Sequence, residues 1–452
     1  MIQQISAIFK NTFLESIRQP IYLIMVGIGV IALVLNLNMA SFTMDDDNKF
    51  LIDMGMATIF LCGLLIAAFV ATSVLTQEIE NRTVLTVVSK PVGRPLFILG
   101  KYLGVSAAVL IAVTILACAF LLTVRHGVMQ TARDNVDAPV VVFGVATIII
   151  SFCAGMAANF LYGWVFTSTT VGVLFPLSML SYAGVLAISK KWTFQLFVDG
   201  SVFGISPDLR PQILLAIYAL GLAILVMCAI AIAASTRLGQ VMTLFTCVII
   251  FVLGLLSDHL FGQRAFEADV LCRISDVREG RDLDQDFSDD GDWYEVILDK
   301  MVDLRKYQQE VLKIDENDPT PIYLSADALG HSMLGSEFDT KPNPRTGMIE
   351  NGVIFRNIDG QRAEMVKVGN LPMIRRPYPG DYIQGGRPKT RMGWRFLWGI
   401  PPNLQSFVLT DAITQRHIIP LSFLVLTTFY AGLYVLTALG LAVILFQKRE
   451  VG

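Results

Sequence analysis

The sequence predicts an all-α polytopic membrane protein with about eight transmembrane helices and an extracytoplasmic α+β domain inserted before the last helix. Of the 452 residues, 54% are hydrophobic and 16% are charged, whereas soluble domains carry about 25% charged residues. The charges are also unevenly distributed, because 45 of them lie in the 155 residues from Gly262 to Arg416. The rest of the chain contains long windows without charge. Most of the chain is therefore suited to lipid, and one inserted block is suited to water.

The first element, residues 1–19, is expected to be an amphipathic helix. Its apolar residues recur every three or four positions, which places them on one helical face. They are Ile2, Ile5, Phe9, Phe13 and Ile17. Such a helix lies in the inner membrane interface or packs against neighbouring protein, and the pattern is compatible with both placements.

The spans follow from windows that are free of charge and long enough to cross a bilayer, for which a helix needs about 20 apolar residues. One window, from Ala138 to Ser189, has room for two helices, and the polar stretch Thr167–Thr170 is the expected break between them. Eight spans result, at residues 20–40, 53–76, 100–124, 139–163, 168–188, 211–234, 239–260 and 418–446.

The loop charges predict the orientation of these spans, because Lys and Arg collect in cytoplasmic loops. With the N-terminus inside, the inner segments hold nine basic and four acidic residues, and the short outer loops hold six basic and eight acidic ones. Both termini are therefore expected in the cytoplasm. The expected organisation is an interfacial helix (1–19), seven spans (20–261) with a cytoplasmic loop at 77–98, an extracytoplasmic domain (262–416), and the last span with a cytoplasmic tail (417–452).

The inserted block combines helix and strand patterns. The acidic run from Asp282 to Asp292 indicates a solvated surface, with cation binding as the alternative. Apolar periodicity predicts a helix from Trp293 to Val311, and two apolar runs predict a β-hairpin of residues 352–356 and 364–368. The aromatic segment Trp394–Gln405 suits the outer membrane interface, with the wall of a substrate exit route as a second possible role.

The longest cytoplasmic loop joins the second and third spans and carries the motif from which function is predicted. An apolar run that includes Val84 and Leu85 lies between polar ends, and Pro91 stops a helix. A short amphipathic helix at the inner membrane face is expected here, of a kind that docks to another protein. An ordinary interfacial helix is the alternative on physical grounds alone.

This loop resembles the cytoplasmic loop of ABC-2-type transporter permeases, in which an acidic-x-acidic-x-x-Thr sequence is followed by an aliphatic run and a Lys-Pro-Val-x-Arg motif. The corresponding residues are Glu78, Glu80, Thr83, Lys90, Pro91, Val92 and Arg94. The segments Thr12–Pro20 and Phe446–Glu450 resemble the same family at its first span and its C-terminus. The chain departs from the family in its number of spans, eight against the usual six, and in the large outer insertion.

The resemblance implies the membrane-spanning permease subunit of an ATP-driven transporter, more specifically an exporter, in the inner membrane of a prokaryotic cell. Such a subunit has no catalytic residues, metal or cofactor of its own. It pairs with a second permease subunit, commonly a copy of itself, and is powered by a separate ATPase. The residues implied in coupling to that ATPase are Glu78, Glu80, Arg82, Thr83, Val84, Leu85, Lys90, Pro91 and Arg94.

Other functions are disfavoured by the residues themselves. The segment Gly93–Tyr102 is no phosphate loop, because six residues separate its glycines where four are needed. The span windows lack the ionisable residues that ion-coupled carriers usually place in the membrane. The outer block shows no nucleophile–base or metal constellation, and nothing indicates nucleic-acid binding. One alternative stays open: a non-transporting device in which an ATPase moves or assembles cell-surface partners of residues 262–416.

Overall fold

The computed structural model of the chain forms two compact units. The first, here called the helical unit, comprises Met1–Leu256 and Pro401–Gly452, and the second, the sheet unit, comprises Ser257–Ile400. The residues that the structure describes are 2–39, 47–80, 93–128, 136–190, 192–193, 211–279, 293–299, 322–324, 352–357, 362–368, 382–390, 392–414 and 419–447.

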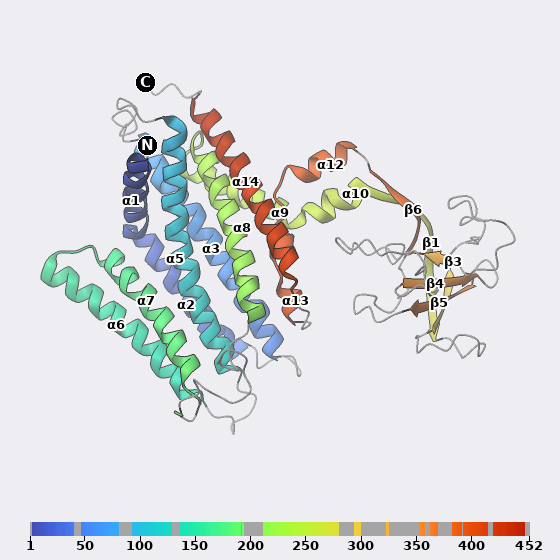
Figure 1. Cartoon of the computed structure of the whole chain (residues 1–452), viewed down its shortest axis with the longest axis horizontal. Helices are drawn as coiled ribbons and strands as arrows, with labels where there is room; N and C mark the ends of the chain where they lie inside the picture. The colour runs from blue at the N-terminus through green and yellow to red at the C-terminus, as the bar shows by residue number, and fades with distance from the viewer. Residues whose placement is uncertain are drawn as a thin grey trace. The chain divides into compact units, whose positions relative to one another are not determined.

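Eight helices among the described residues are long and apolar enough to cross a membrane. They are α2 (Pro20–Met39), α3 (Asp47–Glu80), α5 (Arg94–His126), α6 (Ala138–Tyr162), α7 (Phe166–Ala187), α8 (Pro211–Ser235), α9 (Gln240–Ser257) and α14 (Leu421–Gln447). Figure 1 shows α2, α3, α5, α8 and α14 running side by side, with α6 and α7 as a hairpin beside them. The predicted helical membrane fold and the order of its eight spans are confirmed.

The core of the helical unit is centred on α5 and α8, which are buried along most of their length. Several polar groups in this core are bonded internally, as a lipid environment favours. The hydroxyl of Tyr22, for example, is fully buried and donates to the carbonyl of Ala108 at 2.7 Å. By contrast, α6, α9 and α14 expose many large apolar side chains. Their exposure is expected of helix faces that lipid covers.

The predicted break at Thr167–Thr170 is wrong, because α6 ends at Tyr162 and α7 begins at Phe166. Gly163 ends α6 in the left-handed region (φ +65°), a conformation that costs glycine little. The threonines lie in the first turns of α7, where the hydroxyl of Thr170 donates to the carbonyl of Phe166 at 2.8 Å. Hydroxyls satisfied in this way do not interrupt a helix.

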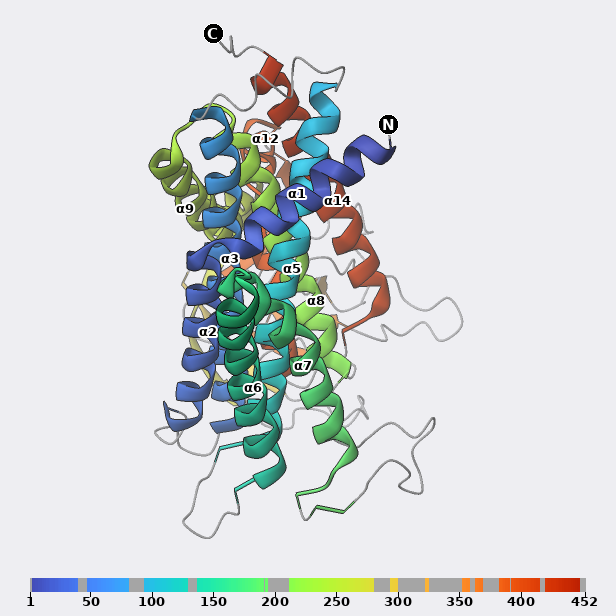
Figure 2. The ribbon, with the colours of Figure 1, turned by 90° about the vertical axis from the view of Figure 1, so that its left-hand side faces the viewer.

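The predicted N-terminal helix is present as α1 (Ile2–Arg18). Figure 2 shows α1 crossing α5, and the contacts described below confirm that the two helices pack against each other. Packing on neighbouring protein, one of the two placements compatible with the sequence, is thus observed, while the position of α1 in the membrane interface stays a prediction.

The sheet unit begins with two short helical segments, carries an antiparallel sheet and ends in a helix. Its elements are η2 (Asp258–Gly262), α10 (Gln263–Ala265), β1 (Phe266–Glu279), β2 (Trp293–Leu298), β3 (Ile322–Leu324), β4 (Gly352–Asn357), β5 (Arg362–Val368), β6 (Tyr382–Thr390) and α12 (Met392–Gly399). The strand order among the described residues is β3-β4-β5-β2-β1-β6. Two further segments, η4 (Leu404–Phe407) and α13 (Thr410–Thr414), precede α14 in the helical unit.

The predicted hairpin is confirmed, since β4 and β5 pair antiparallel with Ile354 opposite Val366. The helix predicted from Trp293 is wrong in its first part, because residues 293–298 form β2 between β1 and β5. Val296 and Leu298 are buried while Ile297 between them is half-buried, so burial follows the two-residue period of a strand. The rest of that predicted helix and the acidic run Asp282–Asp292 lie outside the described residues.

Candidate functional site

The predicted coupling residues lie in the last turn of α3, at the start of α5 and in the chain segment between these two helices. Glu78 and Glu80 lie in the last turn of α3, whose apolar span already ends at Val74. With 34 residues, α3 is about 51 Å long, which exceeds the ~30 Å of a hydrocarbon core. Its last turns therefore extend beyond the span and carry the acidic pair in helical form. Arg94 is the first residue of α5, and Arg82, Thr83, Val84, Leu85, Lys90 and Pro91 lie outside the described residues.

Arg94 contacts the C-terminal end of α14. Its Nη1 donates to the carbonyl of Gln447 at 3.0 Å, and Nε of Arg237 donates to the carbonyl of Leu445 at 2.9 Å. The last four carbonyls of a helix lack partners within it, and cations are favourable there because of the helix dipole. Two arginines from different parts of the chain thus cap one helix end.

Apolar packing supports the same contact between α5 and α14. The rings of Phe97 and Phe446 are stacked with centroids 5.8 Å apart, and both side chains are buried. Phe97 lies one turn after Arg94, so the first turn of α5 is joined to the last turn of α14 by both a hydrogen bond and a ring contact.

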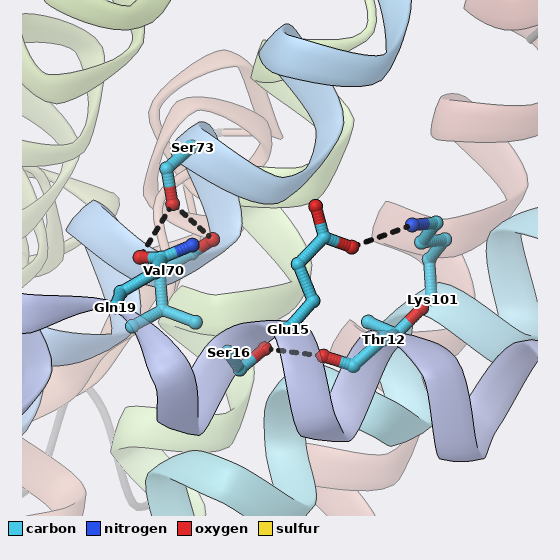
Figure 3. Close-up of polar contacts among 7 residues, drawn as sticks. All are labelled: Thr12, Glu15, Ser16, Gln19, Val70, Ser73 and Lys101. Atoms are coloured by element: carbon cyan, nitrogen blue, oxygen red, sulfur yellow. Dashed lines mark hydrogen bonds and ion pairs between the residues drawn. The ribbon is translucent and has the colours of Figure 1, made fainter. Parts of the chain in front are cut away.

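A buried ion pair joins α5 to α1. Nζ of Lys101 lies 3.7 Å from Oε2 of Glu15, and the Lys101 side chain is 3% exposed against 30% for Glu15 (Figure 3). The ammonium also lies 5.8 Å from the centre of the Phe97 ring. A lysine this deeply buried requires a nearby anion. Lys101 is thus engaged with α1.

Two glycines let α1 approach α5 closely. A Cβ at Gly104 would lie 2.7 Å from Cβ of Thr12 and 2.9 Å from the carbonyl oxygen of Phe9, and one at Gly100 would lie 2.8 Å from Cγ2 of Ile8. Small residues four positions apart allow helix backbones to meet in membranes. Sequence reasoning missed this role, although the Gly-x-x-x-Gly spacing in an apolar segment was its signal.

The C-terminal end of α1 is tied to two further helices. Oγ of Ser73, on α3, donates to Oε1 of Gln19 at 2.8 Å, beside the Glu15–Lys101 pair (Figure 3). The hydroxyl of Thr167, on α7, donates to the carbonyl of Arg18 at 2.8 Å. The ends of α3 and α5 that flank the predicted loop are thus joined to α1, and through it to α7.

The other end of α5 carries a second buried ion pair that sequence reasoning missed. Nε of Arg125 lies 3.3 Å from Oδ2 of Asp137, with side chains 4% and 0% exposed. The same guanidinium donates to the carbonyl of Ile188 after α7, and Asp137 caps α6 by accepting from the amide of Val140. Both residues had been counted only as loop charges. The pair fixes α5 to the α6–α7 hairpin.

The described polar contacts of the site join helices to one another. Among the described residues, no group of three His, Cys, Asp or Glu side chains could hold a metal ion. Its described polar contacts are ion pairs and hydrogen bonds between helices, concentrated at the two ends of α5. Such an arrangement can transmit a displacement from one helix to its neighbours.

Comparison with known proteins agrees with the motif in the loop. Residues 6–189 match the family described as ABC-2 family transporter protein, a segment that runs from within α1 past the end of α7 and contains the whole predicted loop. Comparison with curated proteins and with solved structures gave no match. The matched segment includes the ends of α3 and α5 that flank the loop and most of the helix α1 that packs on them, so this part of the chain is similar to the ABC-2 family of transporter proteins.

Proposed function

We propose that this membrane transporter component is the permease subunit of an ATP-driven exporter, and that residues 77–94 couple it to a separate ATPase subunit. The observation that carries the proposal is the attachment of the loop's second end. Arg94 and Lys101 join the start of α5 to α14 and to α1. A loop with these attachments is suited to receive movement and to distribute it to other helices.

The residues of the loop supply complementary kinds of contact for an ATPase cleft. Glu78, Glu80 and Arg82 offer charges, which mainly set specificity and association rate. Thr83 offers a hydroxyl that can cap a short helix, and Val84 and Leu85 offer apolar surface. Lys90 and Pro91 then end that helix before α5 begins. In this proposal the loop, both termini and the ATPase are cytoplasmic, and a second copy of the permease completes the transporter.

Movement would spread through α5 in three directions. At its start, Arg94 acts on the end of α14 and Lys101 acts on α1. Because α5 is continuous from Arg94 to His126, displacement of its first turn also reaches Arg125, which is bonded to Asp137 and so to the α6–α7 hairpin. One rigid helix would thus pass the ATP-driven closure of the ATPase on to α1, α14 and the α6–α7 hairpin.

The test is binding and stimulation of the ATPase by the full-length permease. The subunit that copurifies with the permease is identified by mass spectrometry, and its affinity is measured in nanodiscs for the wild type and for E78A/E80A/R82A. Loss of these three charged side chains should weaken binding of the ATPase by roughly tenfold or more. The matched control is D276A/R278A, which removes two charges that are 55% and 60% exposed on β1. Unchanged affinity of the loop variant would refute the coupling assignment.

The non-transporting alternative is favoured by one feature, the insertion between α9 and α14 of a sheet that has six strands among the described residues. Since α14 is the helix whose end Arg94 caps, movement of the loop reaches the span that follows the sheet unit in the chain. A cell-surface partner that is captured by the sheet unit only while the ATPase turns over would support this function over export.

A further inference from the structure

The exposed apolar side chains of the sheet unit are concentrated in α12 and the residue that follows it. Met392, Phe396 and Ile400 are 82%, 73% and 61% exposed, and Leu397 is exposed as well. Among the side chains of this unit that the structure describes, these are the large apolar ones that stand in solvent. Met392, Phe396 and Ile400 are four residues apart, which places them on one face of a helix.

The opposite face of α12 is held by its own unit. The ring of Trp394 lies with its centre 6.4 Å from that of Phe261 on η2, and the guanidinium carbon of Arg264 lies 5.1 Å from the centre of the Trp394 ring. Trp398, one turn later, is half-buried. The Trp394 indole therefore packs α12 against η2 and α10, and the exposed face is presented by a helix that is already packed.

Chain connectivity keeps this patch within reach of a membrane surface. The segment η2 starts directly after Ser257, the last residue of the span α9. On the other side, Ile400 is four residues before the fully buried Leu404, whose neighbour Asn403 donates its amide to the hydroxyl of Tyr430 on the span α14. An extended chain of four residues covers at most about 14 Å. Ile400, the last residue of the patch, is thus a short stretch of chain away from a segment that is bonded to the span α14.

We propose that α12 is a lipid-binding helix that lies in the interface of the bilayer, with Met392, Phe396 and Ile400 among the acyl chains. Apolar side chains on one face of a surface helix partition into the boundary between headgroups and acyl chains. Aromatic rings are favoured at that depth, and Arg264, held over Trp394, brings a positive charge to the level of lipid phosphates. The proposal does not rest on coupling to an ATPase.

The experiment is photo-crosslinking in the full-length protein, reconstituted in nanodiscs of phosphatidylethanolamine and phosphatidylglycerol. Phe396 is replaced by benzoylphenylalanine, and the products of irradiation are identified by mass spectrometry. The matched control carries the same residue in place of Arg278, which is 60% exposed on β1. The expected result is roughly tenfold more lipid adduct at position 396 than at position 278, because only the former lies on the apolar face of an interfacial helix.

Three outcomes would overturn the proposal: a folded Phe396 variant without lipid adducts, adducts to protein instead of lipid, or equal lipid labelling at the two positions. If the Phe396 variant does not reconstitute, as judged by size-exclusion chromatography, the same replacement at Ile400 tests the same face with the same criteria. Protein adducts would identify the patch as a docking surface for another chain.

Discussion

Replacing Glu15 by glutamine removes the carboxylate that lies 3.7 Å from the ammonium of Lys101 while keeping the shape of the side chain. Replacing one partner of this ion pair should lower the free energy of unfolding more than replacing the other. In E15Q, a charged lysine stays behind in a site where its side chain is 3% exposed. In K101M, the residue left behind is a glutamate that is 30% exposed and can be hydrated.

The magnitude follows from burial and distance. Two unit charges at this separation attract each other by about 4 kcal/mol at an effective dielectric constant of about 20. Stranding a fully buried charge costs about 3–5 kcal/mol. Because water reaches Glu15, the pair is partly screened, and we expect E15Q to lower the free energy of unfolding by about 1–3 kcal/mol. K101M places a flexible apolar chain beside Phe97 and should cost less than about 1.5 kcal/mol.

The assay is denaturant unfolding of the full-length protein in nanodiscs, with the wild type, E15Q, K101M and the double variant forming a mutant cycle. The double variant should resemble K101M alone, because glutamine no longer strands a charge once the lysine is gone. K10M, on the exposed side of α1, is the matched control for loss of a lysine. If E15Q costs no more than K101M, or if the two effects simply add, the account of Lys101 as a buried charge held by Glu15 is wrong.

Three further predictions concern the ends and the middle of α5. Replacement of Gly104 by alanine should lower the free energy of unfolding by about 1–3 kcal/mol, because the added Cβ meets α1 backbone at 2.9 Å; the same replacement of Gly221, with nothing within 4 Å, should not destabilise. R94A should accelerate hydrogen exchange in the last turn of α14, whose terminal carbonyl loses its partner; unchanged exchange would show that the cap is not needed. D137N should lower the free energy of unfolding by about 3–5 kcal/mol, which is more than E15Q, since Arg125 would stay buried without its anion. A smaller loss of stability than for E15Q would contradict this order.

The spans could be predicted because lipid imposes its requirement on every stretch of about 20 residues, independently of what each stretch contacts. The turn between α6 and α7 depends on finer detail. Four consecutive hydroxyl residues look like a loop, yet Thr170 bonds the carbonyl of Phe166 four residues earlier and stays helical. Gly163, which does end α6, is one glycine among several in that window, and its φ of +65° has no local signature beyond the residue type.

The strands of the sheet unit show where local pattern stops being sufficient. The β4–β5 hairpin could be predicted because two apolar runs flank a short turn and pair with each other. In β2, the spacing of Trp293, Val296 and Ile297 fits one face of a helix. Its strand conformation is determined by pairing with β1 and β5, and Glu295 of β2 lies opposite Glu364 of β5, 69 positions away in the sequence. Such partners are non-local, so periodicity over a short window could not reveal them.

The position of the loop could be predicted from its residue types. The contacts that connect the loop to the spans could not, because they join residues far apart in the chain. Arg94, Lys101 and Arg237 entered the prediction of orientation as basic residues of inner segments, and the structure gives each an intramolecular partner as well. The two roles are compatible, since an arginine at the membrane boundary is also well placed to cap a helix end. These intramolecular contacts limit the use of the three residues in tests of membrane orientation. Replacing these residues to test orientation would also weaken α14 or α1, so a change in topology after such replacement would not isolate the effect of charge. Lys10, which is exposed on α1, is the better residue for that purpose.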